Sequence, residues 1–222
     1  MKKISINNIF RRSWDTFTQD WKIFLSAGLI ISIVAFLTEL KFDSSSFYTA
    51  SEFFIKLIGG LLSVFLSLGL IRMILNRIRG KKIALRNLFE NISLKLYFSF
   101  LIVGIVYAII IGFGFIALII PGLILMSGLY MTQYLVADEK AKVMESFSKS
   151  WKLTKGNRWR IFFFLILIGI ISIIGALTLV GMIVVIPFIS IASTYLYNDI
   201  VSGGEVRAHE EVTSEDKEGE NE

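Results

Sequence analysis

Residues that could carry out acid–base, nucleophilic or metal chemistry are scarce in this sequence. Its 222 residues include no cysteine and a single histidine, His209, which stands in a polar tail ahead of two glutamates. No serine lies in a Gly-x-Ser-x-Gly turn, no His-Glu-x-x-His pattern is present, and no pair of carboxylates lies within an apolar stretch. Because the side chains that hydrolysis requires are missing, we predict a protein that is not an enzyme and that has no cofactor and no metal site.

The side chains suited to binding are instead basic and aromatic, and they flank long apolar stretches. Lys and Arg attract anionic lipid headgroups, and indole rings favour the depth at which those headgroups lie. We predict headgroup contacts by Arg11, Arg12, Lys149, Lys152, Lys155, Arg158 and Arg160. We predict interfacial anchors at Trp14, Trp21, Trp151 and Trp159.

The composition indicates that a membrane surrounds these residues. Hydrophobic residues make up 55% of the chain and charged residues 18%, and the mean hydropathy is +0.69. A soluble domain has about 25% charged residues, so the composition excludes an ordinary soluble domain, a disordered protein and a nucleic-acid-binding module. We therefore expect no nucleic-acid partner.

Four apolar tracts predict six membrane crossings. Residues 23–40 and 54–75 are each long enough to cross once as a helix. Residues 96–136 and residues 161–198 contain no charged side chain, and each tract is too long for one crossing. Each is therefore expected to fold back on itself, the first at 112–114 and the second at 175–181. The predicted fold is all-α: an integral membrane bundle of six transmembrane helices in three hairpins. The predicted spans are about 23–40, 54–75, 96–113, 115–136, 161–178 and 180–198, within a domain of residues 1–202 that precedes an acidic, disordered tail at 203–222.

Most of the 23 Lys and Arg residues lie before the first span, between spans two and three, or between spans four and five. Loops rich in Lys and Arg stay in the cytoplasm. We therefore predict a multi-pass protein of the cytoplasmic (inner) membrane with both termini in the cytoplasm.

A segment with helical periodicity precedes each predicted hairpin, at residues 6–21, 85–96 and 144–151. We expect three amphipathic helices at the cytoplasmic interface, with Asp138 as the N-cap of the third. Short matches also suggest an internal repeat: Ser-Trp pairs occur at 13–14 and 150–151, and a proline precedes a serine by six residues at Pro121 and Pro187. Recurrence of such pairs at membrane interfaces is the alternative explanation.

Three stretches of the sequence resemble one bacterial family. They are IPGLI at 120–124, YLVADE at 134–139 and SFSKSWKLTKGNRW at 146–159. They are similar to the polytopic membrane proteins grouped with the membrane domain of glycerophosphoryl diester phosphodiesterases, a family largely of unknown function. The resemblance implies a bacterial polytopic membrane protein without the phosphodiesterase barrel, and it carries no catalytic activity over to this chain.

These observations favour a non-enzymatic membrane protein that interacts with lipid or acts as an envelope scaffold. Its expected partners are anionic membrane lipids, together with a second copy of the chain or an envelope protein. A permease-like carrier of a lipid or apolar small molecule is the first alternative, because helix kinks at Pro121 and Pro187 would interrupt two hairpins at matching places. An accessory role in glycerophosphodiester metabolism, which the family resemblance suggests, is the second.

Overall fold

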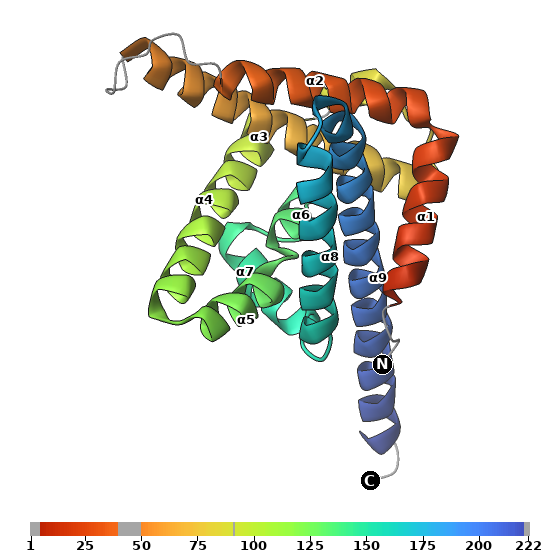
Figure 1. Ribbon diagram of the computed structural model, residues 1–222. Coiled ribbons are helices and arrows are strands. Elements are labelled where there is room, and N and C mark those ends of the chain that lie inside the picture. The colour runs from red at the N-terminus through yellow and green to blue at the C-terminus, as the bar shows by residue number, and fades with distance from the viewer. Residues whose placement is uncertain (1–4, 40–49, 91, 220–222) are drawn as a thin grey trace.

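The computed structural model describes residues 5–39, 50–90 and 92–219, and every regular element in these ranges is helical. Side chains are described in the same ranges except at 50–51, 179–180 and 204–219. The elements are α1 (Ile6–Gln19), α2 (Trp21–Glu39), α3 (Ala50–Ile78), the 3-10 helix η1 (Leu85–Leu88), α4 (Leu94–Ala117), α5 (Ile119–Leu129), α6 (Thr132–Ala137), α7 (Val143–Leu153), α8 (Arg158–Ala176) and α9 (Leu179–Gly219) (Figure 1). The all-α prediction is confirmed for the described part of the chain.

Six stretches of the described chain are long and apolar enough to cross a membrane, so the protein is a multi-pass membrane protein. They are Trp21–Glu39, Glu52–Ile78, Leu94–Ala117, Ile119–Ala137, Arg158–Ala176 and Gly181–Gly203. The fourth stretch comprises two helices, α5 and α6, with a break between them at residues 130–131. The number of spans therefore agrees with the number predicted, although the boundaries differ by several residues.

The reversal between the third and fourth spans lies further along the chain than the sequence suggested. The turn was expected at 112–114, but α4 continues through these residues and the chain reverses at Leu118, which has extended backbone angles. Gly114 instead permits close packing of α4 on α5: a Cβ at this position would lie 3.1 Å from the Cα of Gly122. Glycine near the hairpin tip thus serves helix–helix contact rather than chain reversal. The other reversal, at residues 177–178, falls inside the expected 175–181.

The two prolines have different settings. Pro187 lies inside α9, and because proline has no N–H, the carbonyl of Ile183 loses its intrahelical donor. Gly28 of α2 crosses α9 directly over this carbonyl, since a Cβ on Gly28 would lie 2.1 Å from the Ile183 oxygen. Pro121 instead lies in the first turn of α5, where an N–H has no intrahelical partner, so the structure shows a helix start there and not the expected kink.

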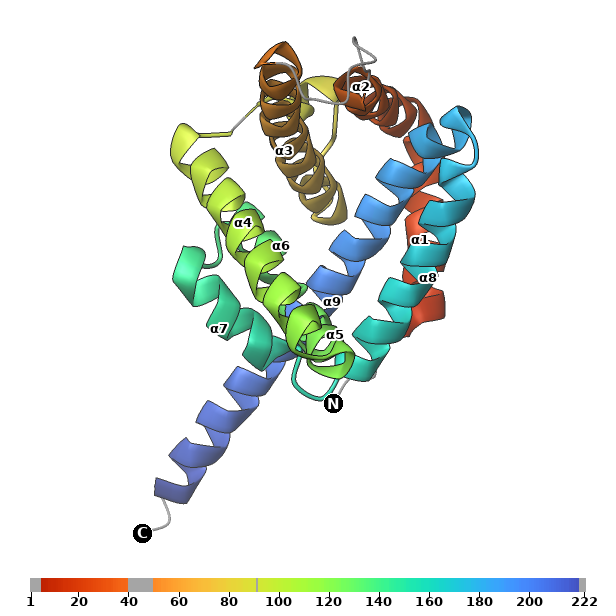
Figure 2. The same cartoon turned by 60° about the vertical axis from the view of Figure 1, so that its left-hand side comes forward.

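Helix α9 is the centre of the bundle and packs against α1, α2, α3 and α8. Figure 2 shows it running along the bundle and projecting beyond it. Two clusters of buried apolar side chains meet along α3 and α9. The first contains Phe100, Leu135, Ile161, Phe164 and Leu196, and the second contains Phe17, Phe24, Leu70, Ile74 and Ile191.

Two predicted segments differ from the structure. Residues 85–96 were expected to form one amphipathic helix, but they contain only the short η1, followed by a new helix whose N-cap Ser93 accepts a hydrogen bond from the Leu96 N–H at 3.2 Å. The tail from residue 203 was expected to be disordered, but α9 continues through it to Gly219.

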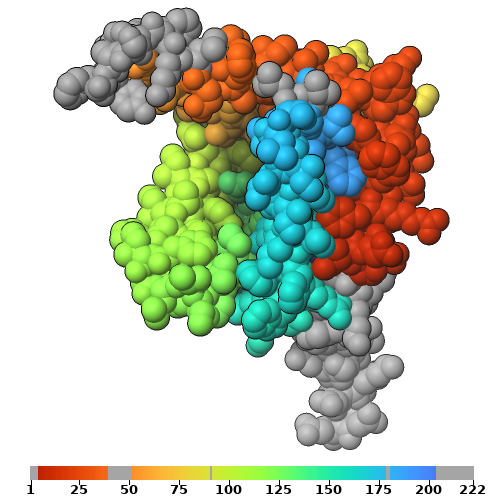
Figure 3. Space-filling model, viewed as in Figure 1, coloured from red at the N-terminus to blue at the C-terminus, as the bar shows by residue number. Residues whose placement is uncertain are grey.

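Large apolar side chains cover much of the outer surface of the spans, among them Phe36, Ile58, Phe113 and Ile173. Figure 3 shows one face of the molecule, on which α8 stands between the α4–α5 pair and the α1–α2 pair. A contiguous apolar exterior of this kind suits hydrocarbon and not water.

Candidate functional site

Four ion pairs connect helices around the end of α3 and the end of α6, a region that we call the charged end. Arg72 of α3 pairs with Glu139, and Arg79, which directly follows α3, pairs with Asp138. Both acids lie just beyond α6. Arg77 Nε pairs with Asp20 Oδ2, at the α1–α2 junction, at 2.5 Å. Arg12 of α1 pairs with Asp199 of α9, and its Nη1 donates to Asp199 Oδ1 at 3.2 Å. The charged end therefore ties α1, α3, α6 and α9 together.

A cavity of about 190 Å³ opens between the end of α3 and the end of α6. Its polar lining comes from Arg72, Asn76, Arg79, Lys81, Asp138 and Glu139, and Leu75 and Ala137 complete the wall. Three cations and two carboxylates therefore surround this cavity. Such a lining suits a small anionic group, because a positive charge remains after both carboxylates are paired.

Asp138 is the most deeply placed charge of the site. Its side chain is 3% exposed, it accepts bonds from Arg79 Nη2 at 2.5 and 2.7 Å, and Tyr197 of α9 donates its O–H to Oδ2 at 2.9 Å. Asp138 was expected to cap the N-terminus of the next helix, but it is the C-cap of α6. An acid is unfavourable at a helix C-terminus, so the bonds from Arg79 and Tyr197 compensate it there.

Glu139 has a backbone φ of 55°, in the left-handed region that glycine usually occupies. The next N–H, of Lys140, bonds back to the carbonyl of Leu135 at 2.9 Å and closes the end of α6. Holding a glutamate in this conformation costs about 1–2 kcal/mol. Arg72 offsets part of this cost, because its Nη1 donates to Glu139 Oε1 at 2.5 Å and to the Ala137 carbonyl at 3.1 Å.

The segment around Trp151 docks α7 onto α5. The hydroxyls of Ser150 and Thr154, both fully buried, donate to the carbonyl of Gly128 at 3.0 and 2.9 Å. The Trp151 ring lies directly over Gly128, where a Cβ would meet ring carbons at 2.6 Å. The guanidinium of Arg158 lies 3.6 Å from the centre of the Trp151 ring. The Ser-Trp-x-x-Thr sequence thus positions α7 at the end of α5, just before the break in the fourth span.

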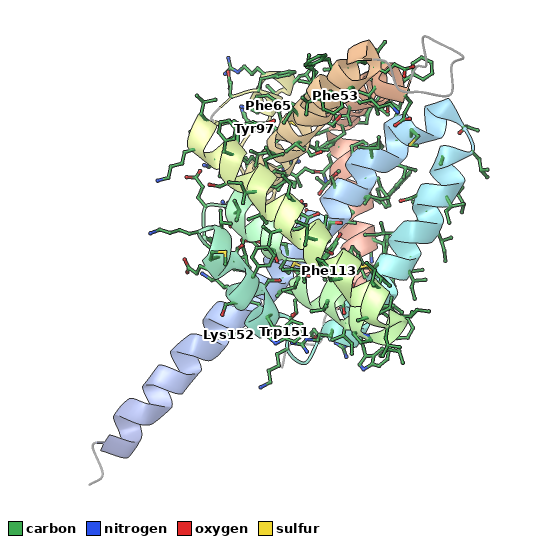
Figure 4. The ribbon with its side chains drawn as sticks, turned by 90° about the vertical axis from the view of Figure 1, so that its left-hand side faces the viewer. Phe53, Phe65, Tyr97, Phe113, Trp151 and Lys152 are labelled. Carbon is green, nitrogen blue, oxygen red and sulfur yellow. The ribbon has the colours of Figure 1, made fainter. Side chains whose placement is uncertain are left out.

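The structure divides the predicted headgroup residues into two groups. Arg12, Lys149 and Arg158 are engaged within the protein: with Asp199, with the Lys140 carbonyl at 3.0 Å and with Trp151, respectively. Arg160 is half-buried and also has a contact within the chain. Arg11, Lys152 and Lys155 are exposed, and within the described residues their side chains have no ion pair or hydrogen bond. Figure 4 shows Lys152 next to Trp151 at the end of α7.

The predicted tryptophan anchors divide in a similar way. Trp14, Trp21 and Trp159 are at least half exposed, whereas Trp151 is only 37% exposed because it covers Gly128. The two Ser-Trp pairs also differ in their partners: Ser13 donates to the carbonyl of Ile9 in its own helix, whereas Ser150 donates to another helix. The internal repeat stays a prediction.

Hydroxyl groups make further bonds to α9 inside the bundle. Tyr130 bonds Ser193 at 2.8 Å, and Thr16 of α1 bonds Tyr195 at 2.8 Å. These bonds satisfy hydroxyl groups that packing removes from solvent, and they join neighbouring helices. Within the ranges that the structure describes, no three His, Asp or Glu side chains are grouped so that they could hold a metal ion.

The residues that line the cavity were not singled out from the sequence as a site. Arg72, Arg79 and Lys81 were informative there only as part of a basic loop. They meet Asp138 and Glu139, which lie more than 55 residues away along the chain, only through packing of α3 against α6. The concentration of charge at the ends of these spans was the one available signal.

Comparison with known proteins finds a match to one family model. The sequence model of a family described as "Domain of unknown function (DUF7847)" matches residues 94–209. No curated protein and no solved structure matches the chain. The matched region extends from α4 into α9 and includes the α5–α7 junction, Asp138 and Glu139.

Proposed function

The chain belongs to the DUF7847 family, whose function is unknown, and we propose that it is a non-enzymatic protein of the cytoplasmic membrane that holds anionic lipid headgroups at its charged end. One observation carries this proposal: Arg11, Lys152 and Lys155 are exposed basic side chains that have no ion pair or side-chain hydrogen bond among the described residues. Arg11 and Lys152 lie on α1 and α7, which also carry Trp14 and Trp151, and Lys155 lies just beyond α7. Cations that stabilise the fold have partners within the chain: Arg77 and Arg79 pair with acids, and Lys149 bonds a backbone carbonyl.

In the topology that we propose, α2–α3, α4–α5 and α8–α9 each enter and leave the membrane from the cytoplasmic side. The contacts within each of these pairs support three hairpins. The charged end then faces the cytoplasm with both termini, as the distribution of Lys and Arg requires. Helices α1 and α7 lie at this interface in the proposal: α1 buries Ile9 and Phe17 against the bundle and leaves Arg11 and Trp14 exposed.

The expected contribution of these three exposed cations to lipid binding is substantial. A basic residue near an anionic membrane surface contributes about 1 kcal/mol of binding free energy, which is roughly a fivefold change in affinity. Three such residues together give an upper limit of roughly a hundredfold, because the contributions of neighbouring charges do not add fully.

The test compares two triple variants of the full chain in a neutral detergent. The first replaces Arg11, Lys152 and Lys155 with Gln. The second keeps the charges with Arg11→Lys, Lys152→Arg and Lys155→Arg. Native mass spectrometry measures the phosphatidylglycerol and phosphatidylcholine that each protein retains. We expect the neutral variant to lose its preference for phosphatidylglycerol and the charge-conserving variant to keep it. Equal retention by both variants would contradict the proposal.

The alternative functions receive less support from the structure. Pro187 is buried under α2 inside α9, whereas Pro121 lies in the first turn of α5, so the two prolines do not mark matching interruptions for a carrier path. The description of the DUF7847 family mentions no glycerophosphodiester chemistry, so an accessory role in that metabolism stays a prediction. Association with a second copy or an envelope protein also stays a prediction.

A further inference from the structure

We propose that the cavity between α3 and α6 binds a phosphate group, through Arg72, Arg79 and Lys81. This inference rests on the proposed function where the phosphate belongs to a lipid headgroup, and it names a specific site at the charged end. None of these three residues was among the predicted headgroup contacts.

The two arginines keep hydrogen-bond donors available for a ligand. Arg72 uses only Nη1, which donates to Glu139 and to the Ala137 carbonyl. Arg79 uses only Nη2, which donates to both oxygens of Asp138. The other guanidinium nitrogens of each residue have no hydrogen-bond acceptor among the described residues. Because a guanidinium presents five N–H donors in a plane, each arginine can hold its carboxylate and still donate to a phosphate oxygen.

Lys81 supplies the unbalanced charge of the cavity. The pairs Arg72–Glu139 and Arg79–Asp138 are each neutral in sum, and Lys81 is exposed, lines the cavity and has no ion pair within the described part of the chain. A cation whose charge is not balanced attracts an anion to the site. Lys82 is equally exposed but does not line the cavity, so it provides a matched control.

The space also suits a phosphate group. The cavity of about 190 Å³ is open to the surface and is large enough to admit several water molecules. A phosphate group, with one phosphorus and four oxygens, fits this volume, whereas the glycerol and acyl chains of a lipid would have to remain outside.

Glu139 is positioned as an internal competitor for the ligand. Its side chain is 62% exposed, and it binds Arg72 from a left-handed backbone conformation. A phosphate can replace this exposed carboxylate on Arg72, whereas Asp138 is too deeply buried to be displaced. Removing the charge of Glu139 should therefore strengthen phosphate binding.

The experiment uses the full chain in a neutral detergent, with isothermal titration calorimetry as the readout. The probes are inorganic phosphate, a short-chain phosphatidylglycerol and the matching phosphatidylcholine. The variants are Lys81→Gln, Lys82→Gln and Glu139→Gln. Substitution of Arg79 is avoided, because it would leave Asp138 buried without its cation.

We expect Lys81→Gln to weaken binding of the tighter of the two anionic probes, inorganic phosphate or phosphatidylglycerol, by about tenfold, which corresponds to one charge-assisted hydrogen bond. We expect Lys82→Gln to change the same affinity by less than about twofold. Glu139→Gln should tighten it. Tighter binding of phosphatidylglycerol than of inorganic phosphate identifies a lipid headgroup as the ligand, and the reverse identifies free phosphate. Either result supports the phosphate site if it depends on Lys81.

Equal effects of Lys81→Gln and Lys82→Gln would overturn the site. If the neutral variant of Arg11, Lys152 and Lys155 still lost phosphatidylglycerol in that case, the proposed function would survive without this cavity. If that variant kept its lipid while phosphate binding depended on Lys81, the proposed function would fail and the phosphate site would stand.

Discussion

The docking of α7 on α5 gives a prediction whose size follows from the structure. Ser150 and Thr154 are fully buried, and both hydroxyls lie within hydrogen-bond distance of the carbonyl of Gly128; the Thr154 hydroxyl lies equally close, at 2.9 Å, to the Ser150 carbonyl of its own helix. A neutral hydrogen bond contributes about 1 kcal/mol net, so Ser150→Ala and the nearly isosteric Thr154→Val should each lower the free energy of unfolding by about this amount. Either single variant leaves the carbonyl with one donor.

The double variant should cost more than the sum of the two single variants. With both hydroxyls removed, the buried carbonyl of Gly128 is left unsatisfied, at an additional cost of about 1–3 kcal/mol. The coupling energy in a double-mutant cycle of Ser150→Ala and Thr154→Val should therefore be about 1–3 kcal/mol.

The cycle can be measured by unfolding the purified variants with sodium dodecyl sulfate in mixed micelles and following tryptophan fluorescence. Ser148→Ala is the matched control, because Ser148 lies on α7 but is exposed, and it should change stability by less than about 0.5 kcal/mol. A double variant whose loss equals the sum of the single losses would refute the reasoning, because it would show that the carbonyl has another donor.

Three further predictions concern packing, the charged end and topology. Gly28→Ala should lower the free energy of unfolding by at least about 2 kcal/mol in the same assay, because the added Cβ would clash with the α9 backbone. Gly60→Ala is the matched control: its added Cβ meets open space within a helix, so it should raise the free energy of unfolding by up to about 1 kcal/mol. Arg12→Gln and Asp199→Asn should show a coupling energy of less than about 1 kcal/mol that falls as salt is added, because the pair is partly exposed; a salt-independent coupling would contradict this. A reporter enzyme that is active only outside the cytoplasm should be active when it is fused after Leu40. An inactive fusion at this position, together with activity of a cytoplasm-specific reporter, would overturn the topology.

The sequence was a good guide to the secondary structure and the number of spans, because both depend on local composition. A run of about 20 apolar residues becomes a helix in lipid wherever it lies. It was a weaker guide to the ends of the helices. Gly112 and Gly114 suggested a turn, but α4 continues through them to Ala117. Gly114 lies where α4 packs closely on α5, a contact that composition alone does not report.

The candidate site could be predicted only in kind. The sequence indicated which side of the bundle is basic, but it assigned Arg12, Lys149 and Arg158 to headgroups, and the structure gives them partners within the chain. Whether a cation is available to a ligand depends on the acids that packing brings next to it, and Arg12 and Asp199 are separated by 187 residues. No spacing rule along the chain reports such a pair.

What the sequence by itself determined is therefore the class of the protein: an all-helical membrane chain with six apolar crossings, for which hydrophobicity over short windows is sufficient. The tertiary structure alone decided which charged side chains have partners within the fold and which have none among the described residues. It placed Arg72, Arg79 and Lys81 around one cavity with Asp138 and Glu139, because α3 and α6 end side by side. The physical reason is that hydrophobicity depends on neighbouring residues in the sequence, whereas a binding site depends on distances between residues that are far apart in the sequence.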